Sequence, residues 1–180
     1  MKKRLVIAVT GTPGTGKSSF AGGLARRLNA KLVRLNELIE DEGAYRLDSD
    51  GSRLVNLREM RRGFSKVLRR TEGPIVVEGH LSHFLPPNSL SHVVVLRTHP
   101  RILEERLRKR RYPEKKVRDN VEAEAIDLIL WEAVKFHGME RVFEIDTTEG
   151  GDTIELFLDA LKGKTELRPG RIRWLEEYFR

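Results

Sequence analysis

Cysteine is absent from the 180 residues, which excludes disulfides, thiolate metal sites and cysteine nucleophiles. Long hydrophobic runs are also missing, and no stretch approaches the ~20 apolar residues that a membrane span requires. The basic start at residues 1–4 precedes a short apolar run at 5–9, which is shorter than the ~7–15 residues of a signal-peptide core. We therefore expect an intracellular, cytoplasmic protein with no membrane partner.

Aromatic residues make up only 7% of the chain, whereas hydrophobic residues make up 39% and charged residues 34%. The hydrophobic share is enough to bury a core, and the length suits one domain of ~100–200 residues. Lys and Arg total 34 against 27 Asp and Glu, which leaves a net charge of +7 at pH 7. This surplus favours anionic partners such as nucleotides, nucleic acid or an acidic protein.

Short apolar runs alternate with amphipathic segments along the chain. Strands are expected at residues 4–10, 31–35, 74–78, 92–97 and 141–145. Helices are expected at residues 18–28, 37–42, 55–70, 101–110, 116–136 and 153–161, and the polar segment 42–51 is expected to be mobile. The alternation predicts an α/β three-layer sandwich, in which helices cover both faces of a five-stranded parallel sheet.

The domain organisation is expected to be simple. Residues 1–162 would form a single core, and residues 163–180 a basic amphipathic tail. The apolar residues of this tail are Ile172, Trp174, Leu175, Tyr178 and Phe179. The tail either packs back on the domain, which so many apolar residues favour, or docks a partner.

A glycine-rich motif near the start of the chain fits the pattern G-x-x-x-x-G-K-[ST]. It consists of Gly11, Thr12, Pro13, Gly14, Thr15, Gly16, Lys17 and Ser18. Its glycines let successive backbone N–H groups point at one anion, and the following helix adds its positive end. Lys17 is expected to reach the β- and γ-phosphates of ATP, and the Ser18 hydroxyl to bind Mg²⁺. A chance glycine turn is the alternative, but the position between a buried strand and an amphipathic helix favours a P-loop NTPase.

The third expected strand ends in Glu78, Gly79 and His80. In a P-loop fold the neighbouring strand commonly ends in a carboxylate that holds Mg²⁺ through water, which is the role expected of Glu78. Gly79 would let a substrate approach the backbone closely. His80 lies where an attacking group or water would lie, although an ordinary strand-end charge and a structural histidine remain the alternatives. The other histidines are expected to be surface or packing residues, and the five histidines show no spacing typical of a zinc site.

Basic residues cluster between residues 97 and 118. Arg106 and Arg110 are four residues apart, so they share a helix face and could neutralise charge on a transferring phosphoryl group. Tyr112 and Pro113 interrupt this helix and suggest a hinged lid that excludes water. A solvated basic face and an RNA-binding stripe are the alternatives.

Three motifs together resemble the atypical adenylate kinases of the isoenzyme-six type, also called coilin-interacting nuclear ATPases, which have archaeal members. These motifs are the glycine-rich loop, residues 77–80 and residues 111–124, and the resemblance spans residues 5–145. It implies a nucleoside monophosphate kinase fold, the reaction ATP + AMP = 2 ADP with Mg²⁺, and ATP hydrolysis. It also implies a part in small ribosomal subunit maturation through a platform ribosomal protein, with rRNA as a further possible partner. We expect a monomer or weak oligomer.

The resemblance also assigns roles to individual residues. It implies ATP contacts by the loop, Ser19, Thr147 and the lid at residues 109–119, which includes Arg110. Residues 34–57 would bind AMP, with contacts from Asn36, Gly79 and His80, and His80 would match the catalytic histidine of the family. Lys17, Glu78, His80, Arg106 and Arg110 are thus the expected catalytic residues, and Ser18 and Glu78 the expected metal ligands.

This chain departs from the family at three of these positions. Glu78 replaces the usual aspartate, Arg111 replaces a glycine of the lid, and Glu40 stands where an arginine of the AMP segment is common. A glutamate at position 40 would repel the AMP phosphate. Two further hypotheses therefore stay open: an ATPase assembly factor that binds a ribosomal protein or rRNA with little AMP kinase activity, and a P-loop kinase for another acceptor.

Overall fold

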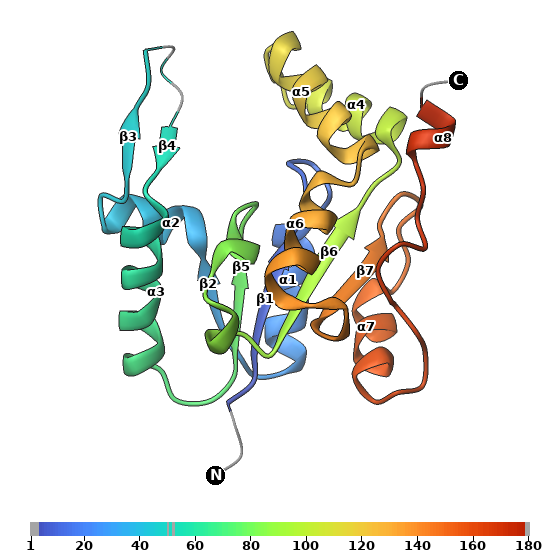
Figure 1. Ribbon diagram of the computed structural model, residues 1–180. Helices are drawn as coiled ribbons and strands as arrows, with labels where there is room; N and C mark the ends of the chain where they lie inside the picture. Colours follow the sequence, from blue (N-terminus) through green and yellow to red (C-terminus); the bar gives the residue numbers. More distant parts are fainter. Residues whose placement is uncertain (1–3, 50, 52, 179–180) are drawn as a thin grey trace.

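The computed structural model describes residues 4–49, 51 and 53–178. Five parallel strands form its main sheet, namely β1 (Val6–Thr10), β2 (Lys31–Arg34), β5 (Ile75–Glu78), β6 (His92–Arg97) and β7 (Val142–Asp146). Their order across the sheet is β2-β5-β1-β6-β7, with all neighbours parallel (Figure 1). The expected five-stranded parallel sheet is therefore confirmed.

Helices connect these strands and lie on both faces of the sheet (Figure 1). They are α1 (Lys17–Arg27), α2 (Leu35–Asp41), α3 (Leu57–Arg70), α4 (Pro100–Lys109), α5 (Glu114–Ala125), α6 (Leu128–His137), α7 (Thr153–Leu161) and α8 (Leu175–Tyr178). Three short 3-10 turns lie at Ser82–Phe84, Pro87–Ser89 and Met139–Arg141. Successive strand residues point to opposite faces, so each strand contributes to two separate cores.

The two cores confirm the three-layer arrangement. On one face, Val6 and Ala8 of β1 pack in a cluster that includes Phe64 of α3 and Ala133 of α6. On the other face, Ile7 and Val9 pack with residues of α1 and α7. Both faces of the three inner strands β1, β5 and β6 are thus covered, which explains why their sequences read as apolar runs.

The expected single helix at residues 116–136 is wrong, because the chain breaks into α5 and α6. Asp127 adopts a left-handed backbone conformation with φ 58°, and its carboxylate pairs with the guanidinium of Arg97. Asp tolerates this conformation better than most residues because its short polar side chain bonds locally. A tertiary ion pair at the break therefore accompanies the change in helix direction.

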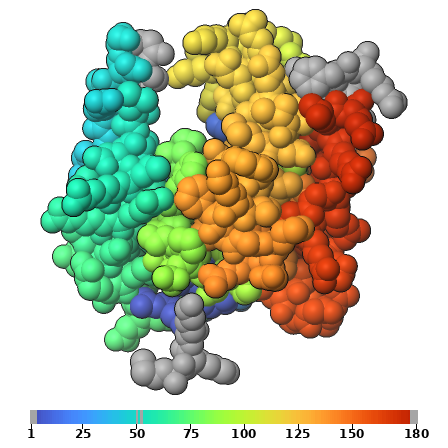
Figure 2. Space-filling view, viewed as in Figure 1, coloured from blue at the N-terminus to red at the C-terminus, as the bar shows by residue number. Residues whose placement is uncertain are grey.

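The segment expected to be mobile, residues 42–51, contributes instead to an antiparallel hairpin. Its strands are β3 (Tyr45–Leu47) and β4 (Arg53–Val55), and the Asn56 N–H donates to the Ala44 carbonyl at the base. The hairpin projects beyond the carboxyl ends of the parallel strands, opposite α5 (Figure 1). Figure 2 shows the surface hollowed between the hairpin and α5.

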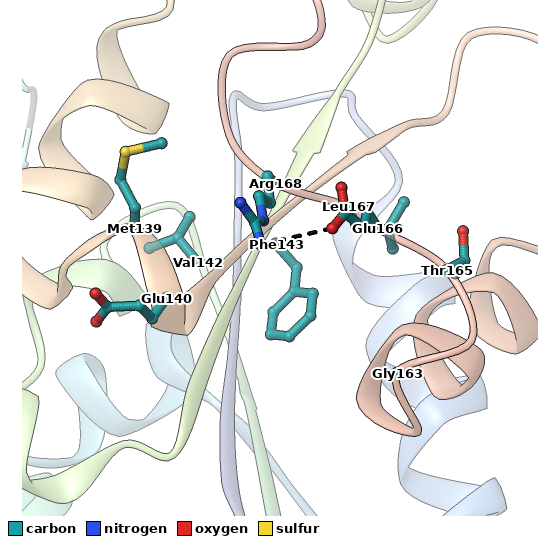
Figure 3. A pocket seen from close by; sticks show the side chains of 9 residues that line it. All are labelled: Met139, Glu140, Val142, Phe143, Gly163, Thr165, Glu166, Leu167 and Arg168. Atoms are coloured by element: carbon teal, nitrogen blue, oxygen red, sulfur yellow. Dashed lines mark ion pairs between the residues drawn. The ribbon is translucent and has the colours of Figure 1, made fainter.

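The start of the tail packs back on the domain. Glu144 of β7 donates its N–H to the Leu167 carbonyl, and the Leu167 side chain joins the core beneath α1 and α7. A cavity of about 500 Å³ lies between the start of β7 and residues 163–168, at the end of the sheet away from the glycine-rich loop (Figure 3). Two apolar residues of the predicted tail cannot be placed in this way, because Phe179 and the side chain of Tyr178 lie outside the part of the chain that the structure describes.

Candidate functional site

The glycine-rich loop connects β1 to α1 and is curled by its own hydrogen bonds. Gly11 has φ 139°, and a Cβ atom there would lie 2.5 Å from the Leu96 carbonyl oxygen, so no other residue fits without moving the backbone. The Thr12 carbonyl accepts hydrogen bonds from the Thr15 N–H at 3.2 Å and from the Lys17 ammonium at 2.9 Å. The curled loop therefore presents its amides at the positive N-terminus of α1, which suits a phosphate chain.

The two residues expected to hold a metal lie together. β1 and β5 are neighbours in the sheet, and Val9 is in register with Glu78, which sets this carboxylate beside the loop. The Ser18 hydroxyl lies 3.4 Å from Glu78 Oε1. Mg²⁺ usually binds one or two protein oxygens and takes its remaining ligands from water and phosphates. Ser18 and Glu78 fit this pattern.

Lys17 occupies a buried site that makes its ammonium less stable than that of an exposed lysine. Burial lowers its pKa to about 8, while the carboxylates of Glu78 and Glu124 oppose that change and Arg110 adds to it. The influence of Arg110 places this lid residue electrostatically close to the loop. A phosphate chain would stabilise the ammonium form further, because an adjacent anion favours the charged amine.

His80 follows Glu78 at the carboxyl edge of β5. Its carbonyl accepts a hydrogen bond from the Thr10 hydroxyl at 3.2 Å, which ties it to the end of β1. Burial, with a further contribution from the Lys17 charge, lowers the pKa of the His80 imidazole. A neutral ring at pH 7 can accept a proton from water or orient it.

Arg106 binds oxygens of the protein. Its guanidinium donates to the Gly14, Thr147 and Thr148 carbonyls at 3.4, 3.0 and 3.2 Å, and to the Thr98 hydroxyl at 3.3 Å. It thus joins the loop to the end of β7. A catalytic role for Arg106 stays a prediction, whereas the contacts show a residue that holds the loop.

Thr147 makes a second connection between β7 and the loop. Its hydroxyl donates to the Thr15 carbonyl at 2.9 Å and lies 2.8 Å from both the Arg97 carbonyl and the Thr98 hydroxyl. This geometry brings Thr147, for which the resemblance implies an ATP contact, to the edge of the glycine-rich loop. A direct ATP contact by Thr147 stays a prediction.

Arg97, the first residue of the basic cluster, does not lie on a solvated face. Its side chain is buried, and its guanidinium donates to Glu124 Oε1 and Glu144 Oε1, each at 2.7 Å. The desolvation of an arginine at the end of a central strand requires such partners. The sequence did not reveal them because they lie 27 and 47 residues away.

Glu124 is a site residue that sequence reasoning did not identify. Its second carboxylate oxygen, Oε2, accepts a hydrogen bond of 2.5 Å from the Thr12 hydroxyl in the loop. Glu124 shares the buried face of α5 with Val117, Val121 and Ala125. A carboxylate at an apolar helix position is a signal of a buried ion pair, and it was available in the sequence.

His83 was also not assigned to the site. It is buried, with Thr10 Oγ1 2.9 Å from Nδ1 and Glu132 Oε2 3.0 Å from Nε2. Burial lowers the pKa of its imidazole to about 3, and the charges of His137 and His80 act in the same direction. His83 therefore supports the end of β1 as a neutral packing residue.

The segment expected to bind AMP forms the wall of the hollow opposite α5. Asn36 is exposed on α2, and Gly79 lies against Leu35 at the start of this helix. Glu40 forms an ion pair with Arg53 of the hairpin, with both side chains about half exposed. The negative charge of Glu40 is therefore balanced by a partner in the same segment.

The described residues lack two features, a cluster of metal ligands and a helix that could span a membrane. Across residues 4–49, 51 and 53–178, no three His, Cys, Asp or Glu side chains cluster closely enough to hold a metal by themselves. Within the same ranges, no helix combines the length and apolar character needed to cross a membrane.

Sequence comparison gives consistent results. Residues 7–127 match the profile of the AAA domain family. A protein of Pyrococcus abyssi is 40% identical over 97% of this chain and 93% of its own length, and one of Methanothermobacter thermautotrophicus is 41% identical over 93% and 95%. A relative from Methanocaldococcus jannaschii is 36% identical over 96% and 94%. All three carry the name "Putative adenylate kinase".

Solved structures share the fold at low sequence identity. Shikimate kinase from Acinetobacter baumannii, in complex with shikimate, superposes with a TM-score of 0.60 at 18% identity, over 91% of this chain and 96% of that one. A gluconokinase from Sinorhizobium meliloti gives 0.54 at 20% identity, over 90% and 93%. The architecture is therefore that of a P-loop NTPase of the kinase type.

Proposed function

Because this chain belongs to the AAA domain family and to its adenylate-kinase-like branch, we propose that it transfers the γ-phosphoryl group of ATP to AMP. The observation that carries this proposal is the meeting of Lys17, Ser18 and Glu78 at one edge of the sheet. The hollow between the hairpin and α5 provides a second side from which an acceptor can approach (Figure 2).

Each residue has a role in this reaction. Lys17 and the loop amides bind the β- and γ-phosphates, while Arg110 approaches from the lid and stabilises the charge that spreads over the transferring group. Ser18 and Glu78 would hold Mg²⁺, which would supply positive charge against the phosphates. An AMP phosphate oxygen attacks the γ-phosphorus as its bond to the β-phosphate oxygen breaks, and two ADP molecules result.

A second candidate is ATP hydrolysis by an assembly factor of the isoenzyme-six type that acts in small ribosomal subunit maturation. The neutral His80 beside Lys17 favours it, because such a ring can orient water towards the γ-phosphate. The Glu40–Arg53 pair favours it as well, since Arg53 is then partly withheld from an AMP phosphate. This function predicts nucleotide-dependent binding of a platform ribosomal protein or rRNA.

The experiment measures ADP and free phosphate from radiolabelled ATP, with and without AMP, and with a panel of small alcohols and polynucleotide ends. ADP formation that depends on AMP is the expected result, and Lys17→Ala should reduce it by more than about 10³-fold. Lys31→Ala, which changes an exposed lysine of β2, is the matched control. Phosphate release at the same rate with and without AMP would support ATP hydrolysis instead. A labelled product formed from another acceptor would show that this acceptor, and not AMP, is the substrate.

A further inference from the structure

A buried ionic network extends in two directions from Arg97. Arg97, Glu124 and Glu144 are 1%, 3% and 4% exposed, and each carboxylate gives one oxygen to the guanidinium. The other carboxylate oxygen of each residue, Oε2, contacts a different part of the chain. One of these parts is the glycine-rich loop and the other is the C-terminal segment.

On the loop side, Glu124 acts through Thr12. The Thr12 hydroxyl donates to Glu124 Oε2 at 2.5 Å, and Thr12 is only 1% exposed. Its hydroxyl is therefore occupied by the protein and is not a ligand for phosphate. The carbonyl of the same residue accepts from the Lys17 ammonium at 2.9 Å, so the position of Thr12 affects the position of Lys17.

On the other side, Glu144 binds the C-terminal segment. Its Oε2 accepts from the backbone N–H groups of Gly170, Arg171 and Ile172 at 2.9, 3.0 and 3.4 Å. Beyond these amides the ring of Trp174 stands 4.9 Å from the ring of His99, which caps α4. Trp174 therefore marks the place where this segment docks.

Buried charges of this kind are satisfied in few arrangements, because each lost hydrogen bond leaves a desolvated group without a partner. A phosphate that displaces the Lys17–Thr12 contact would shift the glycine-rich loop. That shift would move Glu124 through Thr12, and Glu144 through Arg97. By linkage, any effect of nucleotide on the docked segment implies an equal effect of the segment on nucleotide affinity.

We propose that Glu124 is a positioning residue for the glycine-rich loop, and that the network Thr12–Glu124–Arg97–Glu144 couples nucleoside triphosphate binding to docking of residues 170–174. The coupling rests on nucleotide binding at the loop, as the proposed function does, and is independent of the acceptor. Neither the motif nor the fold requires a C-terminal segment to hold the loop, so the coupling belongs to this chain's own contacts.

The test follows Trp174 fluorescence during titration of the full chain with Mg²⁺–ATP. The chain has two tryptophans, and Trp131 is 59% exposed on α6, so a Trp131→Phe background isolates the signal of Trp174. Calorimetry on the same samples measures ATP binding. In this background we expect a saturable change in Trp174 emission with the same midpoint as the calorimetric isotherm.

Four variants, one of them a control, then separate positioning from folding. Thr12→Val replaces the hydroxyl by a methyl group and so removes the hydrogen bond to Glu124. It should raise KM for ATP by about tenfold, with a smaller effect on kcat, and should abolish the emission change at saturating ATP. Thr12→Ser should restore both. Glu144→Gln should raise KM for ATP by about threefold or more, whereas Glu155→Gln, which breaks an exposed pair with Arg27, should not.

The outcomes are distinct. An emission change that persists in Thr12→Val at saturating ATP would mean that nucleotide reaches Trp174 directly, and it would overturn the coupling. ATP binding without any emission change, or Glu144→Gln with an unaltered KM, would overturn it too. If the unsubstituted chain failed to bind Mg²⁺–ATP in calorimetry, the proposed function would fall and the coupling with it.

Discussion

Lys17 is the residue whose surroundings most directly constrain the proposed chemistry. Its ammonium must meet phosphate charge, yet burial holds its pKa near 8 in the free protein. The carboxylates of Glu78 and Glu124 only partly offset this burial. The residue therefore titrates within an accessible pH range, whereas an exposed lysine titrates near pH 10.4.

This environment predicts that kcat/KM for ATP falls as the pH rises. kcat/KM reports the free enzyme, so it should decline by up to tenfold per pH unit above about pH 8, as Lys17 loses its proton. Initial rates between pH 6.5 and 10 would measure the decline. Arginine stays charged throughout this pH range, so Lys17→Arg should have a lower kcat/KM for ATP that changes less with pH. A wild-type profile that stays flat to pH 9.5 would contradict the assignment.

Gly79 is the second residue with a sharp local constraint. A Cβ atom at this position would lie 2.9 Å from Leu35 Cβ, so Gly79→Ala must push away the first residue of α2. Because α2 belongs to the segment proposed to bind AMP, KM for AMP should rise by about tenfold while KM for ATP changes little. Gly22→Ala is the control, since its Cβ would meet only Arg26 Nη1 at 3.8 Å. Equal KM values in Gly79→Ala and wild type would exclude AMP binding against α2.

At the scale of elements, sequence patterns predicted the strands and helices whose formation depends on neighbouring residues. The strands were recognisable because burial on both faces demands continuous apolar runs, as in residues 93–96 of β6. The α5–α6 break was missed because Asp127 is stabilised by Arg97, a contact that no periodicity reveals. The hairpin strands have three residues each, too few for an alternating pattern to be recognised.

The candidate site likewise contains residues that the sequence identifies and one that depends on tertiary packing. Lys17 and Ser18 are fixed by a motif of contiguous residues, and Glu78 by its place at the end of an adjacent strand. Glu124 depends on how the lid helices pack against the loop, which is set by the separate α4–α5 core of Leu103, Leu107, Val117 and Val121. Only the tertiary structure shows that its carboxylate reaches Thr12.

The outer part of the hairpin can be removed while its base is kept. Tyr45 and Val55 pack against the core and are opposite each other in register, so residues 46–54 can be replaced by Gly-Gly, which makes a tight turn. The melting temperature and ATP affinity should be nearly unchanged, while KM for AMP should rise at least tenfold. Calorimetry and coupled ADP assays would measure both. An unaltered KM for AMP would show that the acceptor does not use the hairpin.

For the whole molecule, the buried histidines tie stability to pH. His83 is 1% exposed with a pKa lowered to about 3, and burial also lowers the pKa values of His92 and His137. In the unfolded chain these rings titrate near pH 6.5. Between pH 6.5 and 3 these histidines therefore bind protons in the unfolded state but not in the folded state. The free energy of unfolding falls as the solution is acidified.

His83 allows this prediction to be tested one proton at a time. Each pH unit within its window costs about 1.4 kcal/mol per fully shifted histidine, so His83 alone should remove about 2–3 kcal/mol between pH 6.5 and 4.5. Urea unfolding across this range should show a shallower loss for His83→Gln than for wild type. Glu132 faces the same ring and titrates in the opposite sense, because burial raises its pKa and its protonation favours the folded state on acidification. Glu132→Gln should therefore steepen the loss, and parallel curves for all three proteins would refute a neutral, buried His83.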